Sequence, residues 1–129
     1  MKSFLSVLLQ RPASSLALTN TRHQRIVART LLTAFDSKSR RTGLLKHDTL
    51  PEGSALIIAP SQAIHTFSMR FSIDVAFVSK DGLVLKVRHR VPPRRIAVSW
   101  RAFAVIELPA GTLETNDTRP GDRLQVEER

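Results

Sequence analysis

Apolar and polar residues alternate with a period of two between His65 and Phe77, in the segment HTFSMRFSIDVAF. Such alternation is typical of β-strands with one buried face. A single straight strand of this length would span roughly 40 Å, which is more than a small domain holds. We therefore predict two strands joined by a bend near Arg70–Ser72. On this parity His65 belongs to the apolar face, and the opposite face carries Thr66, Ser68, Arg70, Ser72 and Asp74.

Other elements follow from the pattern on either side of this segment. Val75–Val78 and Leu83–Val91 flank the sequence SKDG, and Asp-Gly between alternating segments is a strong β-hairpin signal. Asp36 is a suitable N-cap for one short helix, which we expect to end at Gly43 with Leu44 and Leu45 turned inward. Further short strands are predicted at residues 25–32, 54–59, 102–108 and 124–128.

Short strands at regular intervals, separated by turns that contain Pro and Gly, predict a mainly β fold. We expect a single antiparallel domain, sandwich-like, jelly-roll-like or barrel-like, with one short helix and spanning residues 23–129. Residues 1–22 are mixed in pattern and contain Arg11-Pro12 and Ser14-Ser15. We therefore expect residues 1–22 to form an N-terminal arm that is partly disordered.

The composition narrows the classes of site that the chain can hold. With 129 residues it is long enough for one domain with a real core. It has no cysteine, which excludes disulfides, zinc–thiolate sites and thiol nucleophiles. The net charge of +9 is uneven, because residues 1–100 carry 16 Lys and Arg against 5 Asp and Glu, whereas residues 101–129 carry 4 against 6. A basic body of this kind favours an anionic partner or surface.

The first residues imitate an export signal. Lys2 is followed by the apolar run FLSVLL, but this run has only six residues, fewer than the 7–15 of a signal peptide. No apolar run approaches the ~18 residues of a membrane span. We expect a soluble, cytoplasmic protein rather than a secreted one.

Four motifs, in order along the chain, resemble the domain of unknown function 192 family: HTFSMRFSIDVAFV, a KDG turn, VIELPAGT and RPGDRL. RRTGLL is similar to that family's arginine-glycine-leucine segment, and the resemblance runs from about Ile26 to Val126. The chain has Ser68 and Ser72 where the family commonly has Gly and Pro, and Ser61-Gln62 where it often has a cysteine. The resemblance implies a compact, mostly antiparallel sandwich or jelly-roll fold, and it implies no activity.

The polar positions of the first segment are the leading candidate for a binding site. Arg70 and Asp74 lie four residues apart, and a bend between them would allow an Arg–carboxylate clamp for a small anion or a peptide terminus, with Thr66 and His65 at its rim. The spacing favours the alternative, a structural ion pair that stabilises the bend while Asp74 accepts backbone N–H groups.

His65 lies beside the hydroxyl of Thr66, which suggests a nucleophile and its base. Adjacent side chains on a strand point to opposite faces, and the chain has no G-x-S-x-G elbow. We therefore predict a partly buried His65 that donates a hydrogen bond to a backbone carbonyl. His65 and His89 lack a helper carboxylate of the same parity, so we predict no metal site and no cofactor.

A basic run covers residues 86–95. Lys86, Arg88 and Arg90 would project from one strand face about 6.6 Å apart, with Arg94 and Arg95 following. This is a candidate track for nucleic acid or another anionic surface. It lacks interleaved aromatic residues, and Trp100 is the nearest, so the pattern favours a solvated strand face.

Glu107 interrupts the apolar segment AFAVIEL. A buried carboxylate needs a partner, for which Arg70 and Arg101 are candidates. Taken together, the residues predict a non-enzymatic binding or accessory module for an anionic ligand, peptide or macromolecular surface. The alternatives are a small hydrolase or lyase that uses His65, Asp74 and Glu107, and a nucleic-acid-binding module that uses residues 86–95.

Overall fold

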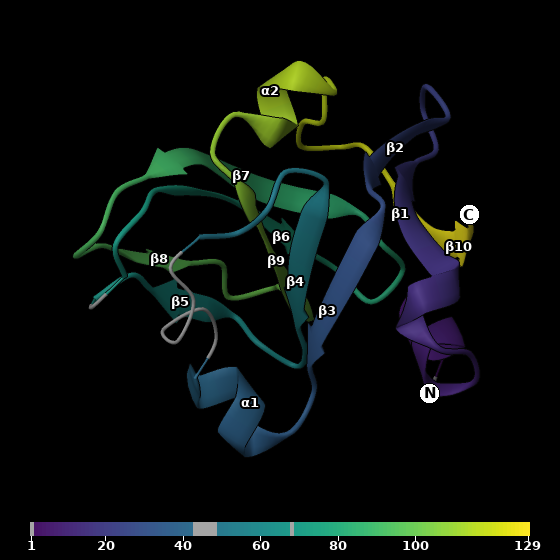
Figure 1. The fold of residues 1–129 in the computed structure, drawn as a ribbon, viewed down its shortest axis with the longest axis horizontal. Helices are drawn as coiled ribbons and strands as arrows, with labels where there is room; N and C mark the ends of the chain where they lie inside the picture. The colour runs from purple at the N-terminus through teal and green to yellow at the C-terminus, as the bar shows by residue number, and fades with distance from the viewer. Residues whose placement is uncertain (1, 43–48, 68) are drawn as a thin grey trace.

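The computed structural model describes residues 2–42, 49–67 and 69–129. Two short 3₁₀ helices, Ser6–Leu9 and Ala13–Ser15, precede the first strand. The strands and helices that follow are shown in Figure 1: β1 (Leu16–Asn20), β2 (Arg25–Ala28), β3 (Thr30–Ala34), α1 (Ser37–Thr42), β4 (Ser54–Ile58), β5 (Ala63–His65), β6 (Ile73–Val78), β7 (Val84–Val91), β8 (Ile96–Val98), β9 (Ala104–Pro109), α2 (Thr112–Thr115) and β10 (Leu124–Glu128).

The strands form three sheets. The central sheet has the order β3-β4-β9-β6-β7, a second sheet has the order β10-β1-β2, and β5 and β8 form a two-stranded ribbon. The pairs are antiparallel except β3 and β4, which run parallel. The mainly β, sandwich-like fold is confirmed, with one parallel pair in addition to the antiparallel arrangement that the pattern predicted.

The central sheet is buried on both faces. Strands β4 and β6 are buried along their whole length, which explains why SALII and IDVAFV read as nearly continuous apolar runs. One face packs against the β10-β1-β2 sheet in the first core, which includes Leu18, Ile57, Ala76, Ile106 and Val126. The other face lies in the second core, with Ile58, Ile64, Val75, Phe77 and Ala97.

The first segment, residues 65–77, contains the bend that its length predicts. Strand β5 ends at His65, bends occur at Arg70 and Phe71, and β6 begins at Ile73. The two strands belong to different sheets, because β5 pairs with β8 whereas β6 pairs with β7 and β9. The bend therefore carries the chain from the ribbon into the central sheet.

The interpretation of residues 1–22 as an arm outside the domain is wrong for residues 16–20. These residues form β1, which is fully buried and pairs with both β2 and β10. The strand was missed because its five residues LALTN give too short a run to stand out. It becomes a strand because Leu16 and Leu18 pack in the first core while β10, from the far end of the sequence, supplies its hydrogen bonds.

The single strand predicted at residues 25–32 is two strands that belong to different sheets. Arg29 interrupts them, and the backbone N–H groups of Arg29 and Thr30 both donate to the carbonyl of Gly53, at 2.8 and 3.1 Å. Strand β2 pairs with β1, whereas β3 pairs with β4. The chain therefore passes from one sheet to the other at this point.

The predicted helix begins where expected. Asp36 caps α1, because its Oδ1 accepts the backbone N–H of Ser39 at 2.7 Å and its Oδ2 accepts the Ser39 hydroxyl at 2.9 Å. The expected terminator Gly43 and the inward-turned Leu44 and Leu45 lie outside the described residues. A second short helix, α2, was not predicted.

Candidate functional site

Asp74 lies inside the protein rather than at a ligand-facing rim. Its side chain is fully buried in β6. Oδ1 accepts the backbone N–H of Arg90 at 2.8 Å, and Oδ2 accepts the backbone N–H of Leu113 at 2.9 Å. One carboxylate therefore holds the end of β7 and the start of α2 together, as the structural alternative for Asp74 predicted.

The predicted pair between Arg70 and Asp74 is not formed. Arg70 is exposed at the bend, whereas both oxygens of Asp74 are used by backbone N–H groups. Thr66, predicted to share a polar face with them, is completely buried. Its hydroxyl donates to the carbonyl of Pro92 at 2.7 Å and accepts the N–H of Arg95 at 2.8 Å. Thr66 thus fastens the segment after β5 to the segment before β8.

The prediction that His65 is partly buried is wrong. His65 is exposed, and Ile64 rather than His65 packs in the second core. The prediction took the odd-numbered positions as buried throughout the segment, as the apolar residues of β6 suggest. The alternation does not continue across the bend, so the even-numbered positions are the buried ones next to and within β5. The ring of His65 lies 5.7 Å from the ring of Phe67, which is also exposed.

Glu107 is the titratable group with the most unusual surroundings. It lies in β9 opposite Leu56 of β4 and Val75 of β6, both in the second core, and only 4% of it is exposed. Its Oε2 is buried and has no hydrogen-bond partner among the described residues, so the predicted arginine partner for this oxygen is not found there. Burial raises the pKa of Glu107 to about 7.

The three residues of the hydrolase alternative are not brought together. Glu107 lies opposite Val75 and faces the second core, whereas Asp74 lies opposite Leu108, a residue of the first core. Residues directly opposite in paired strands share a face, so the two carboxylates point to opposite faces of one sheet. His65 is exposed on the ribbon. This arrangement gives no acid–base pair within hydrogen-bond reach.

The basic strand is less regular than the alternation predicted. Lys86 lies opposite Phe77 and Arg88 opposite Val75, so these two share a face, but a bulge follows and Arg90 has a positive φ of 49°. The ammonium of Lys86 donates to the carbonyl of Val98 at 2.8 Å and lies 5.9 Å from the centre of the Phe77 ring. Lys86 therefore supports packing, while Arg88, Arg94 and Arg95 remain exposed.

Large apolar side chains in β8 and in the segments that follow β5 and β8 are exposed, and the sequence pattern did not mark them as a group. The exposed fractions are 45% for Phe67, 61% for Ile96 and 78% for Trp100. Ile96 is the cross-strand partner of His65, and Gln62, just before β5, donates to the carbonyl of Trp100 at 3.0 Å. We call this group, with the exposed arginines beside it, the ribbon surface: His65, Phe67, Arg94, Arg95, Ile96, Trp100 and Arg101.

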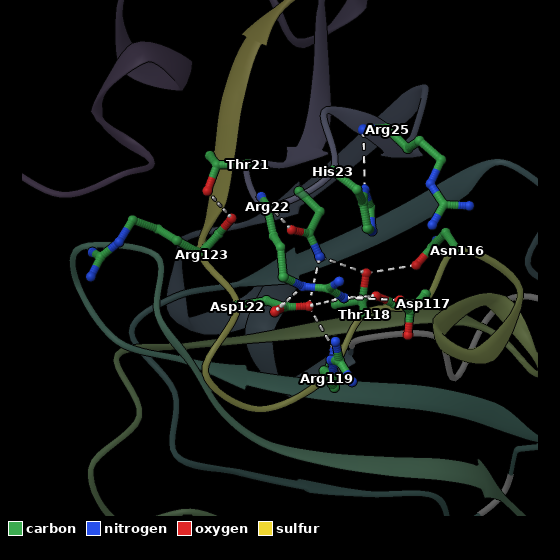
Figure 2. A network of polar contacts seen from close by, with 11 residues as sticks. Thr21, Arg22, His23, Arg25, Asn116, Asp117, Thr118, Arg119, Asp122 and Arg123 are labelled. Atoms are coloured by element: carbon green, nitrogen blue, oxygen red, sulfur yellow. Dashed lines mark hydrogen bonds and ion pairs between the residues drawn. The ribbon is translucent and has the colours of Figure 1, made fainter.

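The RPGDRL motif builds a polar network between the β1–β2 turn and the segment before β10 (Figure 2). Arg22 donates to both oxygens of Asp122, at 2.7 and 3.1 Å, and Asn20 donates to the same carboxylate at 2.9 Å. These hydrogen bonds, the one from Arg22 above all, lower the pKa of Asp122 to about 2. Arg22 and Asp122 lie 100 residues apart in the sequence, so the network joins two distant segments of the fold.

Two further observations concern the described part of the chain. No three His, Asp or Glu side chains within it come close enough to hold a metal ion. None of its helices is both long and apolar enough to cross a membrane.

Fold and geometry together define a small, mainly β domain in which His65, Asp74 and Glu107 do not form one site. The family model of DUF192, described as "Uncharacterized ACR", matches residues 18–126, and the chain belongs to this family. No curated protein matches the chain significantly.

Two solved bacterial structures share the fold. A "putative transcription regulator" from Sinorhizobium meliloti 1021 superposes with a TM-score of 0.75 at 22% identity, covering 86% of this chain and 91% of its own. A protein of unknown function from Novosphingobium aromaticivorans DSM 12444 gives a TM-score of 0.74 at 20% identity, covering 89% of each chain. At these identities the likeness extends to the fold alone.

Proposed function

We propose that this domain is a binding module for an anionic macromolecule, and that single-stranded nucleic acid is the partner that the ribbon surface fits best. The observation that carries the proposal is the exposure of Ile96 in β8, of Phe67 after β5 and of Trp100 after β8, with Arg95 and Arg101 next to Ile96 and Trp100 in the sequence. Apolar rings that folding leaves in water mark interaction sites more often than scattered apolar residues do.

The chemistry of the ribbon surface matches both parts of a nucleotide. The rings of Phe67 and Trp100 offer faces on which unpaired bases stack, and His65 lies against Phe67. The guanidinium groups of Arg95 and Arg101 suit phosphate oxygens. Bases in a duplex are already stacked, so exposed rings favour a single strand over a double helix.

The charge around the ribbon supports a polyanionic partner. Residues 61–103 contain eight Lys and Arg and two acidic residues, Asp74 and Asp81. Asp74 is buried, and Asp81 forms an ion pair with Arg123 at the β6–β7 turn.

Binding can be measured without a label, because Trp100 is the sole tryptophan of the chain. We expect titration with an oligouridylate to quench its fluorescence, and the affinity to fall as salt rises from low to moderate concentration. Phe67→Ala should weaken binding roughly 5- to 150-fold, the range for the loss of one stacking contact. The slope of log affinity against log salt is negative, and Arg95→Ala with Arg101→Ala should reduce its magnitude by about 1 to 1.5.

A matched control removes two exposed arginines from the β2 region, Arg25→Ala with Arg29→Ala. Its net charge equals that of the Arg95→Ala, Arg101→Ala variant. This control should keep most of the affinity. Equal weakening by both double variants would show attraction by net charge alone and would contradict the proposed site. Quenching that is insensitive to salt, or equally tight binding of a polyglutamate peptide or of a duplex, would also overturn the assignment to single-stranded nucleic acid.

A further inference from the structure

We propose a second binding site, for a small organic carboxylate with a short apolar body, in a cleft at the opposite end of β7 from its hairpin turn. The cleft has a volume of about 560 Å³, within the range of small-molecule sites. Residues from β2, from the segment before β4, from the end of β9 and from α2 line it together with Arg90. It shares no residue with the ribbon surface, so it does not depend on the nucleic-acid proposal.

Arg90 supplies the group that would bind the carboxylate. Glu114 forms an exposed ion pair with its Nε at 3.7 Å, and the side chain of Arg90 is 61% exposed. The two terminal nitrogens of Arg90 lie over Gly111, and a Cβ there would be 3.1 Å from Nη2. A side chain at position 111 would therefore crowd the guanidinium, whereas glycine lets the guanidinium lie against the backbone in the lining of the cleft. A guanidinium in this place can pair with two carboxylate oxygens.

The backbone of Arg90 is held in place by the fold. Its backbone has a φ of 49°, which is uncommon for a residue other than glycine. The buried Asp74 accepts its N–H and, with the other oxygen, the N–H of Leu113 in α2. Asp74 is thus the positioning residue that sets Arg90 and α2 on two sides of the same cleft. Backbone held in a sparsely populated conformation is found preferentially at binding sites.

The remaining lining defines the class of ligand. Leu50, Ile26 and Pro109 give an apolar wall that suits a short aliphatic body. Glu52 lines the same cleft, and Glu114 is close to Arg90, so two carboxylates disfavour polyanions and inorganic phosphate there. Glu52 can also receive an ammonium group. Fatty-acid-like carboxylates and α-amino acids share the required chemistry, and an experiment can separate them.

The test uses amide NMR spectra of the whole chain with three probes: 4-methylpentanoate, leucine and inorganic phosphate. We expect saturable shifts of the Gly111 and Thr112 amides with the two carboxylates and not with phosphate. If the ligand is an amino acid, leucine binds more tightly than 4-methylpentanoate, and Glu52→Gln removes that difference. If it is a simple carboxylate, 4-methylpentanoate binds at least as tightly.

Arg90→Asn removes the guanidinium but keeps a residue that tolerates the positive φ, and it should weaken both carboxylates at least tenfold. Arg88→Ala, an exposed arginine on the same strand, serves as the control and should bind normally. The proposal fails if no probe shifts these amides at millimolar concentration, if phosphate binds as well as the carboxylates, or if Arg90→Asn and Arg88→Ala have equal effects.

Discussion

Asp74→Ala is expected to lower the free energy of unfolding by roughly 2–5 kcal/mol, because it removes the acceptor of two backbone N–H groups. The donors are the backbone N–H groups of Arg90 and Leu113, and the carboxylate between them is completely buried. Urea denaturation followed by circular dichroism measures the loss. Amide hydrogen exchange should accelerate first at Arg90 and Leu113, since their protection depends on this carboxylate.

Asp74→Asn should cost nearly as much, because one amide NH₂ group would then face a backbone N–H where an oxygen is needed. Glu114→Ala is the matched control on α2, where an exposed acid near Arg90 is removed and a change within about 0.5 kcal/mol is expected. A loss below about 1 kcal/mol for Asp74→Ala would mean that water satisfies both N–H groups and that Asp74 does not position Arg90.

Glu107→Gln is expected to abolish most of the pH dependence of stability between about pH 4.5 and pH 7. Burial raises the folded-state pKa of Glu107 from an ordinary value near 4.5 to about 7. The folded state therefore binds the proton of Glu107 more tightly than the unfolded state does. The contribution of this protonation to the free energy of unfolding is complete below pH 4.5 and is lost as pH rises through 7. The shift corresponds to roughly 3 kcal/mol.

Denaturation curves at pH 5, 6, 7 and 8 for both proteins check this expectation. The wild-type free energy of unfolding should fall over this range relative to that of the Gln variant, which carries no titratable group at position 107. Glu127→Gln, which replaces a carboxylate of β10 that accepts a hydrogen bond from Thr19, provides the control for a Glu-to-Gln change elsewhere in the sheets. If the free energy of unfolding changed with pH in the same way for wild type and Glu107→Gln, ionisation of Glu107 would not destabilise the folded state, and the expectation would be wrong.

Local signals in the sequence were sufficient for much of the fold. The Asp-Gly turn gave the β6–β7 hairpin, the length of the segment from His65 to Phe77 required the bend, and the side chain of Asp36 gave the start of α1. Each of these rests on neighbours within a few residues. Strand β1 depends instead on a partner at the other end of the chain, and no local pattern reports such a partner.

The candidate site was harder to predict, because it depends on which way side chains point after a bend. Period two is kept within a strand, but the bend at Arg70 exchanged the buried and exposed positions, so Thr66 became buried and His65 exposed. The bulge in β7 likewise removed Arg90 from the face of Lys86 and Arg88. Ile96 and Trp100 had one sequence signal of a surface position, because each is adjacent to an arginine, Arg95 or Arg101. A pattern based on alternation alone does not register this signal.

The pairing of β1 with β10 also constrains how the chain folds while it is being synthesised. Leu18 of β1 is paired with Val126 of β10, so the hydrogen bonds between these strands can form only after Val126 has been synthesised. Until the ribosome has released residues 124–128, the apolar segment from Leu16 to Asn20 has one edge without its final partner. Contacts of such long sequence separation slow folding and leave apolar strands exposed in the meantime. The β10-β1-β2 sheet is thus expected to form only after residues 124–128 have left the ribosome, and β1 lacks one of its two neighbouring strands until then.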